Sequence, residues 1–324
     1  MSSTDDSSLK SVLVIGTGSI ARRHLAVLSS FGLRQADVFS RSGRELLVEG
    51  IRTRSVTFDV AGQEDYDLVV ICSKTQDHSR DLVDFVSRGK TVVVEKPLAG
   101  SLQELDVIEA LEVPGPRVMV SFPLRFKEAV STLFHRLREP GGTVIHAHAE
   151  CRSWLPSWRA DRSASKGYWN EPGSGGVALE LIHEFDYLDL LFGPIGLRSV
   201  EDTSPGILGL QVPESIDAIG RGGRGESVTV HLDFCSRVST RTVRFDRGEE
   251  TWTWDVLHST LERETGQAKE VQHFPDDEDR NTSFRRQYQE ILRPGSQPVP
   301  ACSVEEALRV NREVLRAMEV SRGR

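Results

Sequence analysis

The stretch Val12-Leu-Val-Ile-Gly16-Thr-Gly18-Ser-Ile-Ala21 joins a short apolar strand to an amphipathic helix through a glycine turn. Gly16 permits the tight turn, and Gly18 lets a pyrophosphate approach the backbone closely. The N–H groups at the start of the helix are oriented to bind phosphate oxygens. The turn therefore predicts a dinucleotide site formed by Gly16, Gly18, Ser19 and Ile20.

From this turn to about residue 122, Val- and Ile-rich runs alternate with helical patterns. The predicted strands are Val12–Ile15, Ala36–Phe39, Ser55–Phe58, Leu68–Cys72, Thr91–Val94 and Val118–Ser121. The predicted helices are Ile20–Phe31, Ser79–Arg88 and Leu102–Leu111. Continuous apolar strands separated by helices are typical of a parallel sheet covered on both faces. We therefore predict an α/β doubly wound Rossmann domain at residues 1–123.

After about residue 125 the alternation stops, which predicts a C-terminal α+β domain at residues 124–324. Its predicted helices are Lys127–Arg138, Val177–Phe192 and Ser303–Glu319, and Asp276–Arg280 is predicted to be a charged loop. Its predicted strands are Thr143–Ala149, Ser227–Phe234, Ser239–Phe245 and Thr251–Val256. Their close spacing indicates a large, mostly antiparallel open sheet. The bare face of that sheet predicts a homodimer or homotetramer.

Composition narrows the classes of protein and partner. The chain has 324 residues, 38% apolar and 27% charged, with a net charge of −8. Such a surface repels phosphate backbones and anionic membranes, so we expect neither nucleic acid nor membrane as a partner. Four widely spaced cysteines predict no zinc ribbon, no disulfide framework and no metal site, and favour a reducing cytoplasm. The polar start, Met1–Lys10, has no apolar segment and is expected to be a frayed tail.

The end of the second predicted strand carries the signal for the type of dinucleotide. A carboxylate there would bind the ribose 2′-hydroxyl of NAD, but Asp37 stands at the beginning of the strand. Ser40 and Arg41 stand near the expected position, and an arginine can bind a 2′-phosphate with two hydrogen bonds. The residues favour NADP and leave NAD open. An ordinary solvated loop arginine is the alternative interpretation of Arg41.

The fifth predicted strand ends in Val92-Val-Val-Glu95-Lys96-Pro97, which together with the glycine turn resembles the glucose–fructose oxidoreductase, inositol dehydrogenase and MocA family. Other stretches agree in order over nearly the whole chain: His24, Asp67–Cys72, His78, Gly89-Lys90, Phe122–Phe126, Trp158-Arg159, Gly175–His183, Asp186 and Ser303–Val314. The resemblance implies an oxidoreductase that transfers a hydride between a nicotinamide cofactor and a hydroxyl or keto carbon of a sugar. It also implies cofactor contacts from Ser73, His78, Glu95, Lys96, Trp158 and Arg159. The closing helix is expected to pack on the first domain.

The resemblance implies that Lys96 is the proton-transfer residue and that Lys96–Pro97 is a cis peptide. The chemistry is consistent, because oxidation of an alcohol passes a hydride to the cofactor and a proton to a base. A lysine accepts that proton near neutral pH only if its surroundings lower its pKa from about 10.4. A surface lysine in a strand-to-helix turn is the alternative.

The predicted helix Val177–Phe192 is apolar on several sides, yet polar residues interrupt it. Buried polar groups without partners are costly, so the helix should line a polar site. At 100° per residue, Glu180, His183 and Asp186 share about a third of its circumference. We expect His183 to bind a sugar hydroxyl or assist catalysis while Glu180 or Asp186 orients its ring. A hydrogen-bonded core histidine is the alternative.

Leu179 stands where the family commonly has an aspartate, four residues before the histidine. This form resembles members that act on nucleotide-linked sugars. Cations mixed with aromatics, including Trp158, Arg159 and Lys166, would suit a phosphorylated sugar or a pyrophosphate, although a surface loop is the alternative. The predicted substrate-binding residues are Lys96, Arg125, Lys166, Glu180, His183 and Asp186. The alternative functions are a dinucleotide-sensing regulator without catalysis and a reductase of a non-sugar substrate.

Overall fold

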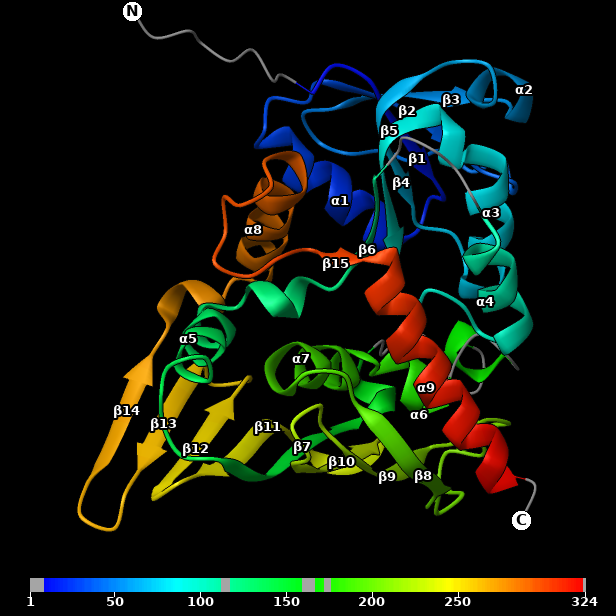
Figure 1. Ribbon diagram of the computed structural model, residues 1–324. Coiled ribbons are helices and arrows are strands. Elements are labelled where there is room, and N and C mark those ends of the chain that lie inside the picture. Colours follow the sequence, from blue (N-terminus) through cyan, green and yellow to red (C-terminus); the bar gives the residue numbers. More distant parts are fainter. Residues whose placement is uncertain (1–8, 112–116, 159–166, 172–175, 323–324) are drawn as a thin grey trace, which may run out of the picture.

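The computed structural model describes residues 9–111, 117–158, 167–171 and 176–322. Two sheets lie at opposite ends of the molecule (Figure 1). The first has the strand order β15-β6-β5-β4-β1-β2-β3. Its strands are β1 (Val12–Ile15), β2 (Gln35–Phe39), β3 (Arg52–Val56), β4 (Tyr66–Ile71), β5 (Gly89–Glu95), β6 (Arg117–Ser121) and β15 (Cys302–Ser303). Strands β1 to β6 are parallel and β15 is antiparallel to β6.

Helices cover both faces of this sheet, as the apolar strands require. The helices are α1 (Ser19–Ser29), α2 (Phe58–Ala61), α3 (His78–Phe85) and α4 (Leu102–Glu109), with the 3₁₀ turns η1 (Thr75–Asp77) and η2 (Val86–Arg88). Helix α1 lies on one face, and α3 and α4 lie on the other (Figure 1). All four residues of β1 are buried. The predicted doubly wound Rossmann fold is therefore confirmed.

The second sheet has eight strands in the order β14-β13-β12-β11-β7-β10-β9-β8. They are β7 (Val144–Trp154), β8 (Gly196–Asp202), β9 (Ser215–Arg221), β10 (Ser227–Asp233), β11 (Cys235–Arg247), β12 (Glu250–Asp255), β13 (Thr260–Glu264) and β14 (Lys269–His273). Only β7 and β10 pair in parallel, and the other pairs are antiparallel. The predicted mostly antiparallel sheet is confirmed.

Helices pack on one face of the second sheet, between it and the first (Figure 1). They are α5 (Glu128–Arg136), α6 (Gly176–Glu180) and α7 (His183–Phe192), with the short turns η3 (Pro123–Phe126), η4 (Leu155–Ser157) and η6 (Tyr168–Asn170). Inward-facing residues of β10 such as Val228 and Val230 are buried, whereas Thr229 between them is partly exposed. This alternation leaves the opposite face of the sheet open.

The last part of the chain returns to the first sheet. Helix α8 (Arg280–Leu292), preceded by η7 (Pro275–Asp277), lies against α1, and α9 (Val304–Arg322) runs from β15 toward β8 (Figure 1). A capping box begins α9, since Ser303 N donates to Glu306 Oε2 at 3.0 Å and Glu306 N to Ser303 Oγ at 3.3 Å. The division of the chain at residue 123 stays a prediction.

Several predicted elements differ from the structure in their bounds or their type. The strand placed at Ser55–Phe58 is β3, Arg52–Val56, because the Thr57 side chain caps α2 by accepting a hydrogen bond from Val60 N. The helix Val177–Phe192 is two helices, since a turn at residues 181–182 separates α6 from α7. The predicted loop Asp276–Arg280 contains η7 and the start of α8.

Helix α8 was missed because it carries many polar residues. Its buried apolar side chains are Phe284, Tyr288 and Ile291, spaced four and three residues apart. This narrow stripe is enough for a helix that packs on one side only. Among the described residues, no helix combines the length and the apolar character needed to cross a membrane.

Candidate functional site

The glycine turn has the geometry of a phosphate cradle. Gly16 has φ +106°, and a Cβ there would lie 2.6 Å from the carbonyl oxygen of Cys72. Gly18 is the N-cap of α1, and a Cβ there would meet nothing within 4 Å. Within the described residues, α1 has no side-chain cap at its N-terminus and no acidic residue in its first turn. Its positive end at Ser19 and Ile20 thus fits a bound pyrophosphate.

Lys96 stands just after β5, at the carboxyl edge of the parallel sheet, where ligands of this fold bind. The predicted cis peptide is present between Lys96 and Pro97. The amine of Lys96 donates to the backbone oxygen of Glu180 at 2.7 Å and lies 3.6 Å from its Oε1. The side chains are 14% and 13% exposed. The fold therefore brings the predicted base to the end of α6.

His183, the first residue of α7, lies in the same region. Its Nδ1 is buried and has no hydrogen-bond partner among the described residues. Its ring packs edge-on against Phe122, with ring centroids 5.5 Å apart. Burial and the positive charges of Lys96, Arg241 and Arg280 lower the pKa of His183 well below 6.5, so the imidazole is neutral at pH 7. A buried polar atom without a partner is unusual and indicates a binding function.

Two predicted substrate residues, Arg125 and Asp186, bind each other in the structure. The Arg125 guanidinium binds the Asp186 carboxylate through two nitrogens, with Nη2 2.7 Å from Oδ1, and both side chains are buried. Arg125 also lies 3.3 Å from Glu306 in α9. This corrects the expectation that Arg125 and Asp186 contact substrate and that Asp186 orients the ring of His183. The break between α6 and α7 explains the error, because it removes the single helical face on which that expectation depended.

A second buried ion pair was not predicted. Arg241 Nε, on β11, donates to Glu184 Oε1 at 2.6 Å, and Tyr187 donates its hydroxyl to the same oxygen at 3.2 Å. Arg241 Nη2 is buried without a partner among the described residues. The sequence held a signal for this residue, because Arg241 shares the inward face of a predicted strand with Val243 and Phe245. A charged residue on an apolar face marks a polar site.

The predicted cofactor residues Ser73 and His78 lie on the segment after β4, next to the cis proline Pro97. Ser73 Oγ donates to Asp81 Oδ2 at 2.5 Å. The buried ring of His78 lies between two carbonyl oxygens, 2.9 Å from that of Pro97 and 3.3 Å from that of Ser73. These bonds hold the turn after β5 against the turn after β4. Glu95 is buried and its Oε1 lies 2.8 Å from His24 Nε2.

The residues predicted to select NADP lie directly after β2. Ser40 Oγ is 3.0 Å from Ser42 Oγ. The guanidinium of Arg41 forms an ion pair with Asp81, lies 3.6 Å from Asp84 and sits over the ring of Phe39. Arg41 is thus held by carboxylates of α3, with its side chain 31% exposed.

Of the predicted site residues Trp158, Arg159 and Lys166, the structure describes Trp158. It is 40% exposed, and its ring packs edge-on against Phe234 with centroids 5.4 Å apart. Arg159 and Lys166 lie outside the described residues.

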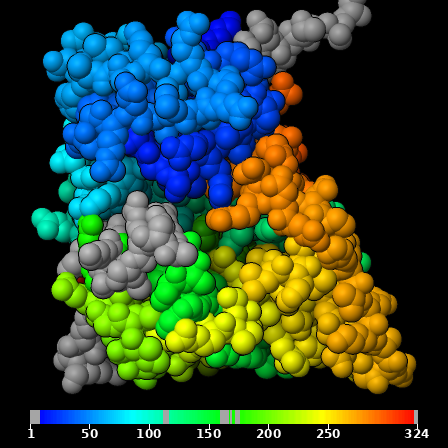
Figure 2. Space-filling model, turned by 180° about the vertical axis from the view of Figure 1, so that it is seen from behind, coloured from blue at the N-terminus to red at the C-terminus, as the bar shows by residue number. Residues whose placement is uncertain are grey.

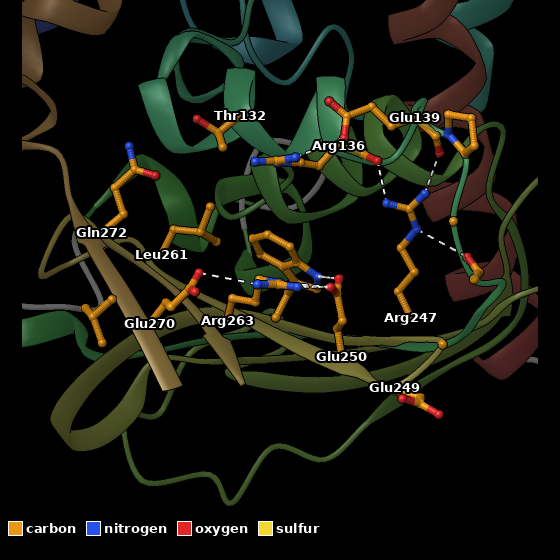
Figure 3. A pocket seen from close by; sticks show the side chains of 16 residues that line it. Thr132, Arg136, Glu139, Arg247, Glu249, Glu250, Leu261, Arg263, Glu270 and Gln272 are labelled. Carbon is orange, nitrogen blue, oxygen red and sulfur yellow. Dashed lines mark hydrogen bonds and ion pairs between the residues drawn. The ribbon is translucent and has the colours of Figure 1, made fainter. Parts of the chain in front are cut away.

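A surface pocket of about 680 Å³ lies at another place, between the end of α5 and the strands β11 to β14 (Figure 3). Its Arg247 donates to backbone oxygens of Glu139 and Gly142, and its Arg263 binds Glu250 (Figure 3). The hydrogen-bond donors of these two guanidinium groups are therefore already used within the protein. None of the predicted site residues lines it.

Residues 10–122 match the profile of the glucose–fructose oxidoreductase, inositol dehydrogenase and MocA family, described as an oxidoreductase family with an NAD-binding Rossmann fold. Over these residues the chain is similar to this family. The family's NAD-binding domain is therefore the one that carries the glycine turn and Lys96.

Two curated relatives come from Saccharopolyspora erythraea. Inositol 2-dehydrogenase 3 is 29% identical over 150 residues, 43% of this chain and 44% of the relative. Inositol 2-dehydrogenase 2 is 32% identical over 123 residues, 35% of this chain and 36% of the relative. The chain thus aligns with less than half the length of these relatives.

Several solved structures match this fold over almost the whole chain. A levoglucosan dehydrogenase in complex with NADH and levoglucosan gives a TM-score of 0.81 at 14% identity and covers 96% of this chain and 97% of its own. A UDP-N-acetylglucosamine 3-dehydrogenase from Acidithiobacillus ferrooxidans gives 0.75 at 17% identity, covering 96% and 98%. An oxidoreductase domain protein from Kribbella flavida gives 0.81 at 16% identity, covering 98% of both chains. At these identities the likeness shows the fold, and it extends to the second sheet.

Proposed function

We propose that this protein is an NAD(P)-dependent oxidoreductase acting on a CH–OH or keto carbon of a sugar, with Lys96 as the proton-transfer residue. One observation carries the proposal. The amine of Lys96 lies at the carboxyl edge of the dinucleotide-binding sheet and donates to the backbone oxygen of Glu180, three residues before His183, whose buried Nδ1 has no partner among the described residues. A cation and an unpaired imidazole nitrogen at this edge suit a polyhydroxylated substrate.

The residues divide the reaction between them. A nicotinamide bound at this edge would accept or supply the hydride. The amine of Lys96, in its deprotonated form, accepts the proton of the substrate hydroxyl during oxidation, and its protonated form returns a proton during reduction. Neutral His183 binds a neighbouring hydroxyl as donor or acceptor, and Glu180 holds the Lys96 amine in position. The low exposure of Lys96 limits access of water to the proton-transfer step.

The test is Lys96→Met, with Lys90→Met as the matched control. Lys90 lies on the same strand but is 80% exposed and binds Asp67. We expect Lys96→Met to lower kcat on an active sugar at least about 1,000-fold, because general acid–base catalysis contributes about 10²–10⁴-fold. NADH and NADPH affinities, measured by fluorescence titration, should change little in both variants. Full activity of Lys96→Met would refute the assignment, and binding without turnover of any sugar would favour a dinucleotide-sensing regulator.

We propose NADP(H) as the preferred cofactor and NAD(H) as the second candidate. Arg41 follows β2 and keeps 31% of its side chain exposed, which leaves it able to reach a 2′-phosphate. The carboxylates of Asp81 and Asp84 beside it favour the NAD alternative, because they neutralise the charge that a phosphate requires. In Arg41→Ala, NADPH affinity should fall about tenfold while NADH affinity stays constant. Equal effects on both cofactors would exclude Arg41 as the selecting residue.

We propose a nucleotide-linked sugar as the substrate, because several cations lie close together near His183. Arg280 at the start of α8 interacts electrostatically with Arg23 of α1 and Arg241 of β11, and burial together with these two charges lowers the pKa of Arg280. The guanidinium of Arg23 lies over the ring of Phe284, 5.7 Å from its centroid. Phe284 stands on α8, one turn after Arg280. Figure 2 shows a recess bordered by these parts of the chain, coloured blue, orange and yellow. A pyrophosphate would relieve the repulsion among the cations.

Arg280→Ala tests the nucleotide-linked substrate, with Arg285→Ala on the same helix as its control. Arg285 is bound to Asp279 and Thr282, so its loss should leave substrate binding unchanged. We expect Arg280→Ala to raise KM for an accepted nucleotide sugar about tenfold or more, the effect of one charge-assisted hydrogen bond. KM for a neutral sugar should stay within threefold, about the limit of an indirect effect. Equal increases for charged and neutral sugars would contradict the proposal.

We also propose a cytoplasmic location. All four cysteines are free thiols, and three of them, Cys72, Cys151 and Cys302, are buried. Unpaired thiols are typical of proteins in a reducing compartment. Fractionation of the native host with detection of the protein would test this.

A further inference from the structure

A buried chain of hydrogen bonds lies directly behind Lys96. Glu95, the preceding residue, is 8% exposed, and its Oε1 lies 2.8 Å from His24 Nε2. The other ring nitrogen of His24, Nδ1, lies 2.6 Å from the hydroxyl of Tyr288. His24 and Tyr288 have no exposed surface. A buried network of this kind keeps its shape only while every member has a partner.

The direction of these hydrogen bonds follows from the chemistry of the groups. Hydrogen bonds from His24 and Ser121 outweigh burial and lower the pKa of Glu95, so its carboxylate is ionised and only accepts. His24 Nε2 therefore carries the proton and donates it to Glu95. In the tautomer with its proton on Nε2, Nδ1 accepts from the hydroxyl of Tyr288, whose pKa burial raises far above 10. Tyr288 thus fixes the tautomer of His24, and His24 fixes the carboxylate of Glu95.

The network joins parts of the chain that are far apart in sequence. His24 lies on α1, which begins at the glycine turn, Glu95 ends β5, and Tyr288 lies on α8. Helix α8 makes a second contact to the same place, since Gln287 Nε2 donates to Ser121 Oγ at 3.1 Å. Phe284 of α8 packs edge-on against the ring of His24, with centroids 5.4 Å apart. Helix α8 therefore determines how the end of β5 is held.

We propose that His24 and Tyr288 are positioning residues for Lys96, acting through Glu95. The proposal rests on the proposed role of Lys96. The hydrogen bonds hold the Glu95 side chain to α1 and α8, and this fixes the backbone from which Lys96 extends toward the oxygen of Glu180. Catalysis depends steeply on such placement, because a displacement of about 1 Å can lower a rate about 100-fold.

Two substitutions of His24 test whether its hydrogen bond to Glu95 is needed to position Lys96. The amide nitrogen of Gln reaches the position of Nε2, so His24→Gln keeps the donor to Glu95. The Asn amide reaches only the position of Nδ1, so His24→Asn loses that donor. We expect His24→Asn to lower kcat about 10- to 100-fold, with cofactor affinity within threefold, and His24→Gln to restore most of kcat. Equal losses in both variants would overturn the proposal, since the donor to Glu95 would then make no difference to kcat.

Tyr288→Phe extends the test to α8 with the loss of a single oxygen atom. Tyr66→Phe is its control, because Tyr66 also donates a buried hydroxyl to a carboxylate, that of Asp37, away from Lys96. We expect a decrease in kcat of about tenfold for Tyr288→Phe and no change for Tyr66→Phe. An unchanged kcat in Tyr288→Phe would refute the part assigned to α8.

A measurement without substrate separates this inference from the proposed function. Reductive methylation followed by peptide mass spectrometry reports the reactivity of Lys96, with exposed Lys90 as the internal reference. In His24→Asn and Tyr288→Phe the ratio of Lys96 to Lys90 labelling should rise at least about twofold as Lys96 loses its fixed position. An unchanged ratio in both variants would reject positioning even if Lys96→Met abolishes turnover. Full activity of Lys96→Met would instead remove the proposed function.

Discussion

At the scale of single residues, the two glycines of the phosphate turn have different physical roles. Gly16 has a positive φ and no room for a side chain, because the backbone of Cys72 stands against it. Gly18 has φ −73°, which any residue adopts, and has open space around it. The first glycine therefore serves the fold, and the open space at the second would let a phosphate approach α1.

Alanine substitutions should separate these roles. Gly16→Ala should lower the free energy of unfolding by more than about 2 kcal/mol, since it adds both strain and a clash. Gly18→Ala should leave stability within about 0.5 kcal/mol and weaken NADH or NADPH binding about tenfold or more. Urea unfolding and fluorescence titration measure the two effects. A Gly18→Ala protein with unchanged cofactor affinity would show that the pyrophosphate does not bind at this turn.

His183 gives the stability of the protein a dependence on pH. Its pKa in the folded chain lies well below 6.5, because burial and nearby cations oppose its charge. Below pH 6.5 the unfolded chain therefore binds a proton that the folded chain does not, and stability falls as the pH falls. Between pH 7 and 5.5 one such histidine accounts for about 1 kcal/mol. On going from pH 7 to 5.5, the free energy of unfolding of His183→Gln should fall by about 1 kcal/mol less than that of the wild type. Urea unfolding at the two pH values measures this. An identical decrease in both proteins would contradict a neutral imidazole in the folded chain.

At the scale of elements, one buried ion pair connects η3, α7 and α9. Arg125 of η3 binds Asp186 of α7 and reaches Glu306, whose carboxylate also caps α9 through Ser303 N. The crossover from the first sheet is thereby fixed to helices of the second half of the chain. Removing one partner from such a pair leaves a buried charge without compensation.

The substitutions Asp186→Asn and Arg125→Met should each destabilise the protein by about 3–5 kcal/mol. The double variant Arg125→Met with Asp186→Leu should be more stable than Arg125→Met alone, because it removes both charges from the interior. Chemical denaturation of the single and double variants measures this. Destabilisation that simply adds in the double variant would show that the two groups do not act as a pair.

At the scale of the whole molecule, one face of the second sheet remains open in the single chain. Ile145 and Ile219 are 67% and 50% exposed. Several histidines accompany them on the sheet, including His148 of β7, which is 2.9 Å from Thr229 Oγ1 of β10. A broad sheet face with exposed apolar residues favours association.

We therefore expect a homodimer or homotetramer that uses this face. Ile219→Glu should increase the monomer fraction in sedimentation velocity, because a charge would be buried in the interface. Ile207→Glu is the control, since Ile207 is 62% exposed in a loop outside the strands. A monomeric wild type, or an equal effect of the two substitutions, would contradict association through the sheet.

Local patterns carried much of the fold prediction. The runs Val12–Ile15 and Leu68–Cys72 predict buried parallel strands, because a strand with only apolar side chains must be covered on both faces of its sheet. The Ser303 and Glu306 spacing predicts a helix start for the same local reason. Helix α8 escaped prediction, since its stripe of Phe284, Tyr288 and Ile291 is apolar only on the side that meets α1.

For the candidate site, the sequence by itself determined the glycine turn and, by resemblance, the lysine after β5, because these depend on backbone conformation and on residues adjacent in the chain. Tertiary structure decided the partners of the polar side chains. Asp186 pairs with Arg125 instead of His183, Arg241 lies beside His183, and Tyr288 reaches His24 from 264 residues away. The physical reason is that a buried polar group bonds to whatever donor or acceptor packing brings within reach, and spacing along the chain does not encode that distance.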